Sequence, residues 1–219
     1  PPTLRLYQWS PPTISLGYFQ KYADYEALPA PAGELPVVRR LTGGGAILHD
    51  LELTYSIALP LGHELLREGA NQLYELAHDA VIAALGELRL AAARCGKSDD
   101  SGAARGPFFC FERRHCYDVL LGSDKIAGSA QRRTRHAILQ HGSIVLGNRF
   151  AQQPTAKTDG SSSVLETLEI IAAIGPNFAG QIERVFGTSL DELGWTQSER
   201  ELTSTLIQKY ESKEWTRRT

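Results

Sequence analysis

Short apolar runs separated by turn residues dominate the first 60 residues of the chain, and they predict strands. Residues 4–9 are rich in leucine and aromatic side chains, Pro11-Pro12 interrupts the run, and residues 13–19 resume it as extended chain. Three further apolar runs predict strands at residues 37–38, 46–48 and 53–59. The segments between the runs contain proline or glycine and are predicted to be loops at residues 29–36 and 43–45.

A helical repeat of apolar residues follows at residues 71–88. Its apolar positions are three or four residues apart, which places them on one face of a helix: Leu73, Leu76, Ala77, Ala80, Val81, Ala84, Leu85 and Leu88. The pattern then returns to strands. Residues 117–121 and 125–130 predict a hairpin across Gly122-Ser123-Asp124, and residues 137–146 predict another strand.

The last part of the chain is polar and then helical. Residues 96–107 are predicted to be a mobile loop, residues 151–163 a linker, and the segment from residue 164 a helical extension that ends in a charged helix at 199–213. The order of elements indicates an α+β fold with a mixed, largely antiparallel central sheet flanked by helices and a small helical C-terminal tail. We therefore divide the chain into a catalytic domain at residues 1–163 and an extension packed on it at 164–219.

Composition narrows the classes of function. Hydrophobic residues make up 42% and charged residues 22% of the 219 residues, which is enough for a packed core, and the net charge of −2 offers no overall attraction for nucleic acid or an anionic membrane. No apolar run is long enough to cross a membrane. The three cysteines do not form a disulfide framework or have the spacing of a zinc site, so we expect a reducing, cytoplasmic setting and no metal.

The candidate chemistry concentrates in residues 39–50, which read Arg-Arg-Leu-Thr-Gly-Gly-Gly-Ala-Ile-Leu-His-Asp. Three successive glycines let the backbone approach a ligand closely, and exposed N–H groups in such a loop can bind a carboxylate, a carbonyl oxygen or a phosphate. Taken alone, the loop is more often a plain turn, and a His-Asp pair is more often a surface pair than a catalytic one.

The string nevertheless resembles the Arg-Arg, Gly-Gly-Gly, His-Asp signature of the lipoate-protein ligase and octanoyltransferase family. Four other segments resemble the same family in the same order: residues 9–20, residues 52–56, the Asp-Lys-Ile-Ala-Gly-Ser-Ala-Gln string at 124–131, and residues 140–144. The ending at Lys209-Tyr210 and Glu214-Trp215 is also similar. This resemblance implies a biotin/lipoate ligase-like fold and an enzyme of protein lipoylation.

The resemblance also implies roles for individual residues. Lys125 would grip the acyl carbonyl, and Cys110 would accept the acyl group, because a thiolate can take an acyl group from a thioester at little thermodynamic cost. Local sequence leaves Cys110 open to a second interpretation, as a small buried hydrophobic residue among phenylalanines. The implied substrate-binding residues are Arg40, Gly43, Gly44, Gly45, His49, Gly128, Ser129, His141 and Gly142.

Three functions remain open at this point. The first is an octanoyltransferase that moves octanoyl from acyl-carrier protein through a cysteine thioester to a lysine of a lipoyl carrier domain, either the glycine cleavage H protein or a dehydrogenase E2, and requires no cofactor. The second is an ATP-dependent lipoate ligase that acts through lipoyl-adenylate and needs ATP and Mg²⁺. The third is a non-catalytic carrier-binding module. Cys110 favours the first, whereas Gly45 is typical of ligases, since octanoyltransferases often carry arginine there; an amidotransferase between carrier domains resembles the chain less.

Overall fold

A computed structural model describes residues 1–96, 106–147, 149–155 and 163–218. Its main sheet has the strand order β1-β5-β9-β8-β7-β6, and every neighbouring pair in it is antiparallel. These strands are β1 (Thr3–Tyr7), β5 (Glu52–Pro60), β6 (Ala92–Arg94), β7 (Val119–Leu121), β8 (Asp124–Arg133) and β9 (Ala137–Val145). The predicted hairpin is thus present, and its strands β7 and β8 turn at Gly122, whose φ of 61° suits glycine.

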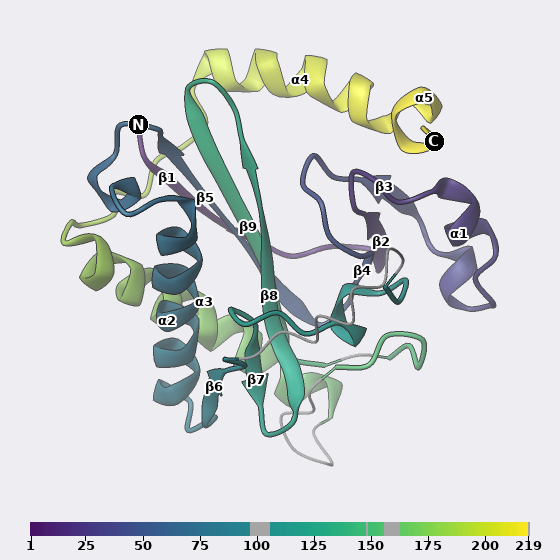
Figure 1. The fold of residues 1–219 in the computed structure, drawn as a ribbon, viewed down its shortest axis with the longest axis horizontal. Coiled ribbons are helices and arrows are strands. Elements are labelled where there is room, and N and C mark those ends of the chain that lie inside the picture. Colours follow the sequence, from purple (N-terminus) through teal and green to yellow (C-terminus); the bar gives the residue numbers. More distant parts are fainter. Residues whose placement is uncertain (97–105, 148, 156–162, 219) are drawn as a thin grey trace.

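A second, smaller sheet has the order β3-β2-β4, in which β2 pairs parallel with β3 and antiparallel with β4. Its strands are β2 (Thr13–Leu16), β3 (Val37–Arg39) and β4 (Ile47–His49). One parallel pair among antiparallel ones confirms the predicted mixed, largely antiparallel α+β fold. In Figure 1 this sheet lies beside the large one, with the short helix α1 (Tyr22–Glu26) on its outer side.

Two long helices pack beside the large sheet, and their sequences explain where they begin. Helix α2 (Ala70–Glu87) buries Leu73, Ala77, Val81 and Ala84, the apolar face that its sequence predicts. Helix α3 (Val164–Phe186) begins at a capping box in which Ser163 and Glu166 satisfy each other's backbone N–H groups, and it ends at the left-handed Gly187. The two helices lie together on one side of the sheet (Figure 1).

Side chains from the start, middle and end of the chain share one hydrophobic core. Phe178 of α3 is fully buried against Tyr55 of β5, with ring centroids 4.9 Å apart. The same cluster contains Leu73 of α2, Ile126 of β8 and Ile144 of β9. The first helix of the proposed extension therefore contributes to the core of the sheet, while the division at residues 163 and 164 stays a prediction.

The chain ends in two helices that cross to the small sheet. Helix α4 (Gln197–Glu211) buries no side chain, whereas the short α5 (Lys213–Thr216) is tied down by the buried Arg39, which donates to the carbonyl oxygens of Thr216 and Arg218. Figure 1 shows α4 spanning the space between the β8–β9 hairpin and the small sheet. The sequence predicts one charged helix at 199–213, and the structure divides this region at Ser212.

Two other predictions for connecting segments can be compared with the structure. The loop predicted at residues 29–36 contains a single 3-10 turn, Ala32–Glu34. The mobile loop predicted at 96–107 lies mostly outside the described residues, as does much of the linker predicted at 151–163. The short strand β6 and helix α1 carry no clear periodicity, and the sequence does not predict them.

We expect the substitution Phe178→Ala to lower the free energy of unfolding by about 3–5 kcal/mol, because it removes a fully buried ring from the shared core. Urea unfolding followed by circular dichroism measures the loss. The matched control is Leu165→Ala on the same helix, since Leu165 is 73% exposed and its loss should cost less than about 0.5 kcal/mol. Equal effects of the two substitutions would contradict the placement of α3 in the core.

Candidate active site

The glycine loop lies between β3 and β4 and touches another backbone directly. Gly44 has a φ of +91°, a conformation that residues with a Cβ rarely adopt. A Cβ on Gly17 would lie 2.0 Å from the carbonyl oxygen of Gly44, so glycine is needed at both positions. The small sheet thus holds the loop by backbone contact on one side.

Arg40 holds the loop from beneath. Its guanidinium donates to the carbonyl oxygens of Ser15, Gly43 and Gly45, at 2.7, 2.9 and 2.6 Å. Burial lowers the pKa of Arg40 to about 10, which leaves it protonated at neutral pH. Nη2 therefore binds the loop and Nη1 binds β2, while Nε is buried without a hydrogen-bond partner among the described residues. Arg40 positions the glycines, and its predicted contact with substrate stays a prediction.

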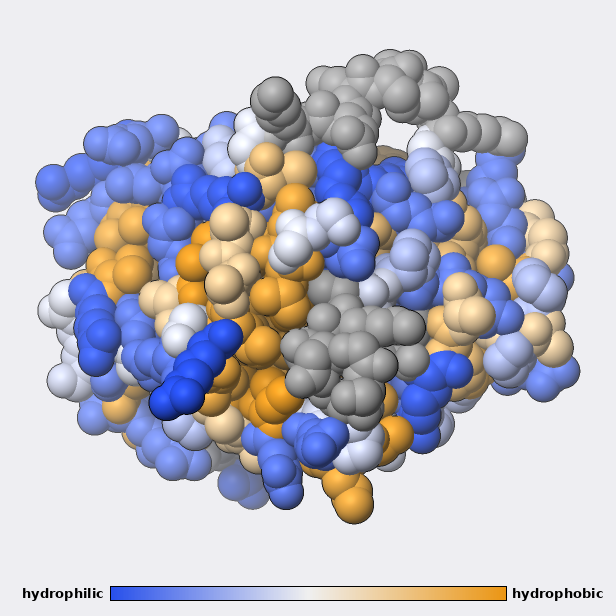
Figure 2. Space-filling model, turned by 90° about the horizontal axis from the view of Figure 1, so that it is seen from below, coloured by the Kyte–Doolittle hydropathy of each residue, from blue (hydrophilic) through white to orange (hydrophobic). Residues whose placement is uncertain are grey.

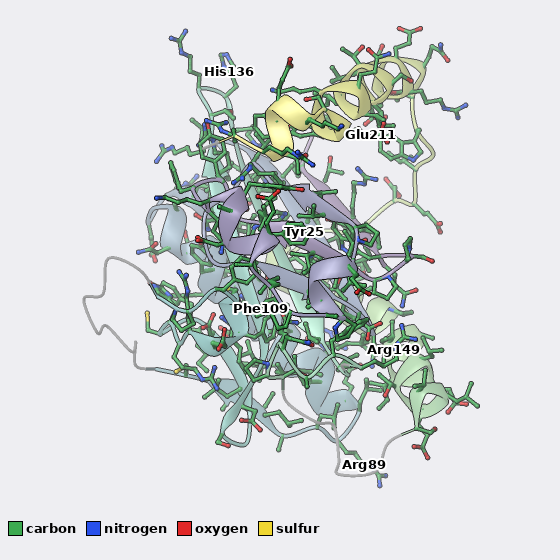
Figure 3. All side chains as sticks on the ribbon, turned by 90° about the vertical axis from the view of Figure 1, so that its right-hand side faces the viewer. Tyr25, Arg89, Phe109, His136, Arg149 and Glu211 are labelled. Atoms are coloured by element: carbon green, nitrogen blue, oxygen red, sulfur yellow. The ribbon has the colours of Figure 1, made fainter. Side chains whose placement is uncertain are left out.

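The loop also pairs with the segment that carries Cys110. Ala46 forms a parallel bridge with Phe109; the Ala46 N–H donates to Phe108, and the Cys110 N–H donates to Ala46, at 2.8 and 2.7 Å. A Cβ on Gly45 would lie 2.9 Å from the Cys110 nitrogen, a distance that real side chains do not reach. Gly45 therefore lets the loop lie directly against the backbone of Cys110. Figure 3 shows Phe109 between the two sheets.

Lys125 of β8 reaches Cys110 from the large sheet. Its Nζ lies 3.8 Å from the Cys110 Sγ and 3.4 Å from the Cys110 carbonyl oxygen. The lysine is 3% exposed, so its ammonium is little screened by water. The sequence-based pairing of Cys110 with Lys125 is thus matched by their geometry.

Asp118 completes the charge arrangement, and the sequence analysis missed it. Its Oδ2 lies 2.7 Å from Lys125 Nζ and accepts the His115 N–H at 2.8 Å. A buried ion pair is tolerated only when further hydrogen bonds satisfy it, as the His115 N–H does here. The predicted hairpin brings position 118 close to position 125, but the register shift between Val119 and Leu120 that sets the contact leaves no mark in the sequence.

Gly128 makes room for this ion pair. A Cβ at position 128 would lie 2.6 Å from Lys125 Cε, 2.9 Å from Lys125 Nζ and 3.0 Å from Asp118 Oδ1. Gly128, which the resemblance assigns to substrate binding, therefore also leaves room for the Lys125 side chain to lie along β8. The next residue, Ser129, lies 2.8 Å from Nε2 of the buried His78.

His78 is a buried support beneath β8. Its Nδ1 donates to the carbonyl oxygen of Tyr117, and burial lowers the pKa of His78 to about 4, so the neutral ring accepts from the Ser129 hydroxyl. The sequence analysis did not assign His78 a role. Its hydrogen bonds link α2 to β8 and to the segment just before β7.

His49 lies in a separate network on the other side of the glycine loop. Its Nδ1 donates to Glu52 at 2.9 Å, its Nε2 lies 2.7 Å from the Ser15 hydroxyl, and its ring stacks on Trp9 with centroids 4.2 Å apart. Ser15 also accepts from Arg40 at 3.2 Å. His49 is therefore connected to the glycines through Ser15 and Arg40, whereas no described contact joins it to Lys125.

His141 and Gly142 of β9, which the resemblance assigns to substrate binding, both make buried contacts. His141 Nε2 is hydrogen-bonded to the Thr42 hydroxyl just before the glycines, and burial, with Arg40 nearby, lowers the pKa of His141 to about 3. A Cβ on Gly142 would lie 2.6 Å from the Tyr55 ring. His141 is therefore neutral at pH 7 and joins the large sheet to the glycine loop, while Gly142 accommodates a core tyrosine.

Two clefts elsewhere in the molecule are not part of the candidate active site. A cleft of about 350 Å³ between β1 and α3 is lined by Leu6, Leu53 and Ile171, and it shares Leu168 with a neighbouring cleft of about 230 Å³ that reaches Arg149. Exposed apolar residues lie at the start of α3, and the lower face of the molecule has a stripe of apolar atoms (Figure 2). Neither cleft is lined by Cys110, Lys125 or the glycine loop.

Two further searches cover the part of the chain that the structure describes. In it, no three His, Cys, Asp or Glu side chains are grouped so that they could hold a metal ion. None of its helices combines the length and the apolar character needed to cross a membrane.

Solved structures show which fold this is. A lipoate-protein ligase A bound with ATP superimposes with a TM-score of 0.73 at 22% identity, covering 99% of this chain and 85% of the other. A bipartite lipoate protein ligase from Thermoplasma acidophilum, described with its E2 lipoyl domain, superimposes with a TM-score of 0.67 at 21% identity, covering 99% and 84%. The fold is therefore that of lipoate ligases.

The sequence comparisons show the family. The family model described as the lipoyl protein ligase A/B catalytic domain matches residues 1–164, and the chain belongs to this family. An octanoyltransferase LipM from Moorella thermoacetica is 36% identical, with the alignment covering 100% of this chain and 87% of the relative. The protein is thus an enzyme of the acyl-transferring class that the resemblance implied.

We expect Gly128→Ala to slow the alkylation of Cys110 by iodoacetamide about tenfold, because the new Cβ displaces the Lys125 ammonium that lies 3.8 Å from the Cys110 Sγ. Peptide mass spectrometry measures the rate at Cys110 separately from Cys95 and Cys116. Gly86→Ala is the control, since a Cβ there meets no atom within 4 Å. An unchanged Cys110 rate in Gly128→Ala would show that Lys125 does not act on the thiol.

We expect Asp118→Asn to lower the free energy of unfolding by about 3–5 kcal/mol, because it leaves the buried Lys125 ammonium without its counter-charge. The double variant Asp118→Asn/Lys125→Met should recover much of this loss, because it no longer buries an unpaired charge. Urea unfolding measures all variants. Asp79→Asn, in a partly exposed pair with Arg94, should cost less than about 1 kcal/mol. If the loss in the double variant equals the sum of the losses in Asp118→Asn alone and Lys125→Met alone, the coupling between Asp118 and Lys125 is contradicted.

Proposed function

We propose that this enzyme is an octanoyltransferase of protein lipoylation, with Cys110 as the residue that carries the octanoyl group. One observation carries the proposal. The Cys110 Sγ lies 3.8 Å from the Nζ of a buried lysine, and the Cys110 backbone lies directly against Gly45, in a chain whose full length aligns with an octanoyltransferase LipM. A ligase that activates lipoate with ATP has no need of a nucleophilic thiol beside its lysine.

In the first step the Cys110 thiolate attacks the carbonyl carbon of an octanoyl thioester. The carbonyl oxygen becomes an oxyanion, which the Lys125 ammonium and backbone N–H groups of the glycine loop stabilise. Among the described residues, the N–H groups of Gly43, Gly44 and Gly45 donate no hydrogen bond, while Arg40 holds the carbonyl oxygens of Gly43 and Gly45 on the other side. The intermediate then expels the donor thiolate, which takes up the proton that Cys110 released.

In the second step the neutral amine of an acceptor lysine attacks the octanoyl-Cys110 thioester. The C–N bond forms, the C–S bond breaks, Cys110 leaves as a thiolate beside the Lys125 ammonium, and the nitrogen loses its proton to water. The amide product is more stable than the thioester, so this step runs downhill without ATP or a metal ion. The partial exposure of Cys110 leaves it accessible to both partners.

The acceptor in this proposal is a lipoyl carrier domain, either the glycine cleavage H protein or a dehydrogenase E2, and the donor is octanoyl-acyl-carrier protein. The solved ligase from T. acidophilum, which is described together with an E2 lipoyl domain, supports a carrier-domain acceptor for this fold. The donor rests on the chemistry of Cys110 alone, since thioester exchange is the reaction that a thiolate performs most readily.

A second candidate is the ATP-dependent lipoate ligase, in which Lys125 and the glycine loop would bind the phosphate of lipoyl-adenylate with ATP and Mg²⁺. Gly45 favours it, because ligases usually keep glycine at this position. The close approach of Gly45 to the Cys110 backbone explains the same glycine without a nucleotide. The ligase reaction also gives no role to the contact between Cys110 and Lys125.

We expect the pure protein, incubated with octanoyl-acyl-carrier protein and no ATP, to acquire one octanoyl group on Cys110, because the thioester is already activated. Intact-protein and peptide mass spectrometry detect the adduct, and hydroxylamine should remove it. Cys110→Ala should abolish both adduct and transfer, whereas Cys116→Ala should retain them. Full transfer by Cys110→Ala would refute the cysteine relay, and strict dependence on ATP and free lipoate would establish the ligase.

A further inference from the structure

Glu52 is a buried carboxylate that the proposed mechanism does not use. It is the first residue of β5 in the large sheet and is 3% exposed. Its Oε1 accepts hydrogen bonds from His49 and Thr54, whereas its Oε2 has no hydrogen-bond partner among the described residues. Burying a carboxylate with an unsatisfied oxygen destabilises a fold, so stability alone does not account for a charge at this position.

The carboxylate is one end of a row of hydrogen bonds whose other end is the guanidinium beneath the glycine loop. A guanidinium only donates and a carboxylate only accepts, so the hydrogen bonds between them all point the same way. Arg40 Nη1 donates to the Ser15 hydroxyl oxygen at 3.2 Å. The Ser15 hydroxyl donates to His49 Nε2 at 2.7 Å, and His49 Nδ1 donates to Glu52 at 2.9 Å. We call these four residues the Glu52–Arg40 relay.

His49 is fixed in the middle of the relay by its neighbours. Its ring is 4% exposed and stacks on Trp9, whose Nε1 donates to the Thr54 hydroxyl at 3.0 Å. Thr54 in turn donates to the same Glu52 oxygen that accepts from His49. The stacked ring therefore keeps one nitrogen toward the carboxylate and the other toward Ser15.

The relay joins two charges that have no nearer counter-charge. Among the residues that the structure describes, Arg40 forms no ion pair with a carboxylate, and Glu52 forms none with a lysine or an arginine. In a buried region successive hydrogen bonds polarise one another, so the two charges stabilise each other through the relay. A guanidinium is planar and rigid, and holding Nη1 of Arg40 also sets the direction in which Nη2 donates to Gly43 and Gly45.

We propose that Glu52 is a positioning residue for acyl transfer. Through the relay its charge keeps the Arg40 guanidinium turned toward the carbonyl oxygens of the glycine loop, so that the loop N–H groups stay oriented toward the oxyanion. This inference rests on the proposed function, in which those N–H groups stabilise the oxyanion. No described contact joins Glu52 to Cys110, and Glu52 therefore acts on the reaction through Arg40.

The test compares two reactions of the Cys110 thiol. Acylation by octanoyl-acyl-carrier protein forms an oxyanion, whereas alkylation by iodoacetamide forms none. We expect Glu52→Gln to lower the maximal single-turnover rate of acylation about tenfold, because it removes the charge but keeps the side-chain volume and an oxygen that can accept from His49. The donor concentration at half-maximal rate and the alkylation rate should both stay unchanged, because Cys110 lies outside the relay. Peptide mass spectrometry measures both reactions.

A second variant, Ser15→Ala, interrupts the relay in its middle. It should lose at least as much acylation as Glu52→Gln, again with an unchanged alkylation rate. The double variant Glu52→Gln/Ser15→Ala should lose no more than Ser15→Ala alone, because either change disconnects Arg40 from the carboxylate. Circular dichroism checks the fold of each variant, and Ser15→Ala decides the test if Glu52→Gln does not fold.

Asp50→Asn is the matched control, because it also neutralises a buried carboxylate, one that pairs with Arg149 at 2.6 Å. It should leave both reactions unchanged. Full acylation by Glu52→Gln, or losses that add in the double variant, would overturn the relay. Equal loss of acylation and alkylation would show that Glu52 only supports the fold. If the wild-type protein forms no octanoyl adduct on Cys110, the proposed function itself fails, and this inference fails with it.

Discussion

The contact between the glycine loop and the Cys110 backbone determines the geometry of the whole site. It joins the small sheet, which carries the loop, to the segment that leads into the Lys125 hairpin of the large sheet. The contact is possible only because position 45 lacks a Cβ, and because Arg40 draws the neighbouring carbonyl oxygens to the opposite side. Without these contacts, the peptide groups of the glycine loop would have no fixed orientation relative to Cys110.

The buried charged side chains around this contact have a counter-charge or backbone hydrogen-bond partners. Lys125 and Asp118 form a buried pair whose carboxylate has a further backbone partner, and the arginine beneath the loop is satisfied mainly by carbonyl oxygens. The nearby His78 and His141 are neutral, since burial lowers their pKa values to about 4 and about 3. The Lys125 Nζ lies 3.8 Å from the Cys110 Sγ, and the two neutral histidines serve as hydrogen-bonding links between elements.

The surroundings of Cys110 and the turn that carries Tyr18 differ in their exposure to solvent. Lys125 and Asp118 beside Cys110 are buried and bound to backbone groups, which suits the oxyanion of the proposed mechanism. Around Tyr18, Arg132 and Arg218 lie over the ring and the neighbouring Phe19 is 82% exposed. Tyr18 and Gln20 connect this turn to the glycine loop and to the Cys110 segment through hydrogen bonds to the carbonyl oxygens of Thr42 and Phe108.

The sequence by itself predicted most of the elements and selected the candidate reacting residues. Apolar runs predicted most strands, the repeat at 71–88 predicted α2, and the resemblance selected Cys110 and Lys125, because these features are local strings of residues. Tertiary structure alone decided that Asp118 pairs with Lys125, that His49 belongs to a different network, that α3 enters the main core, and that arginines from residues 132 and 218 meet on one tyrosine. These contacts depend on strand register, a bulge and the return of the chain end to the small sheet, and pairing between distant segments leaves no periodic trace in a single sequence.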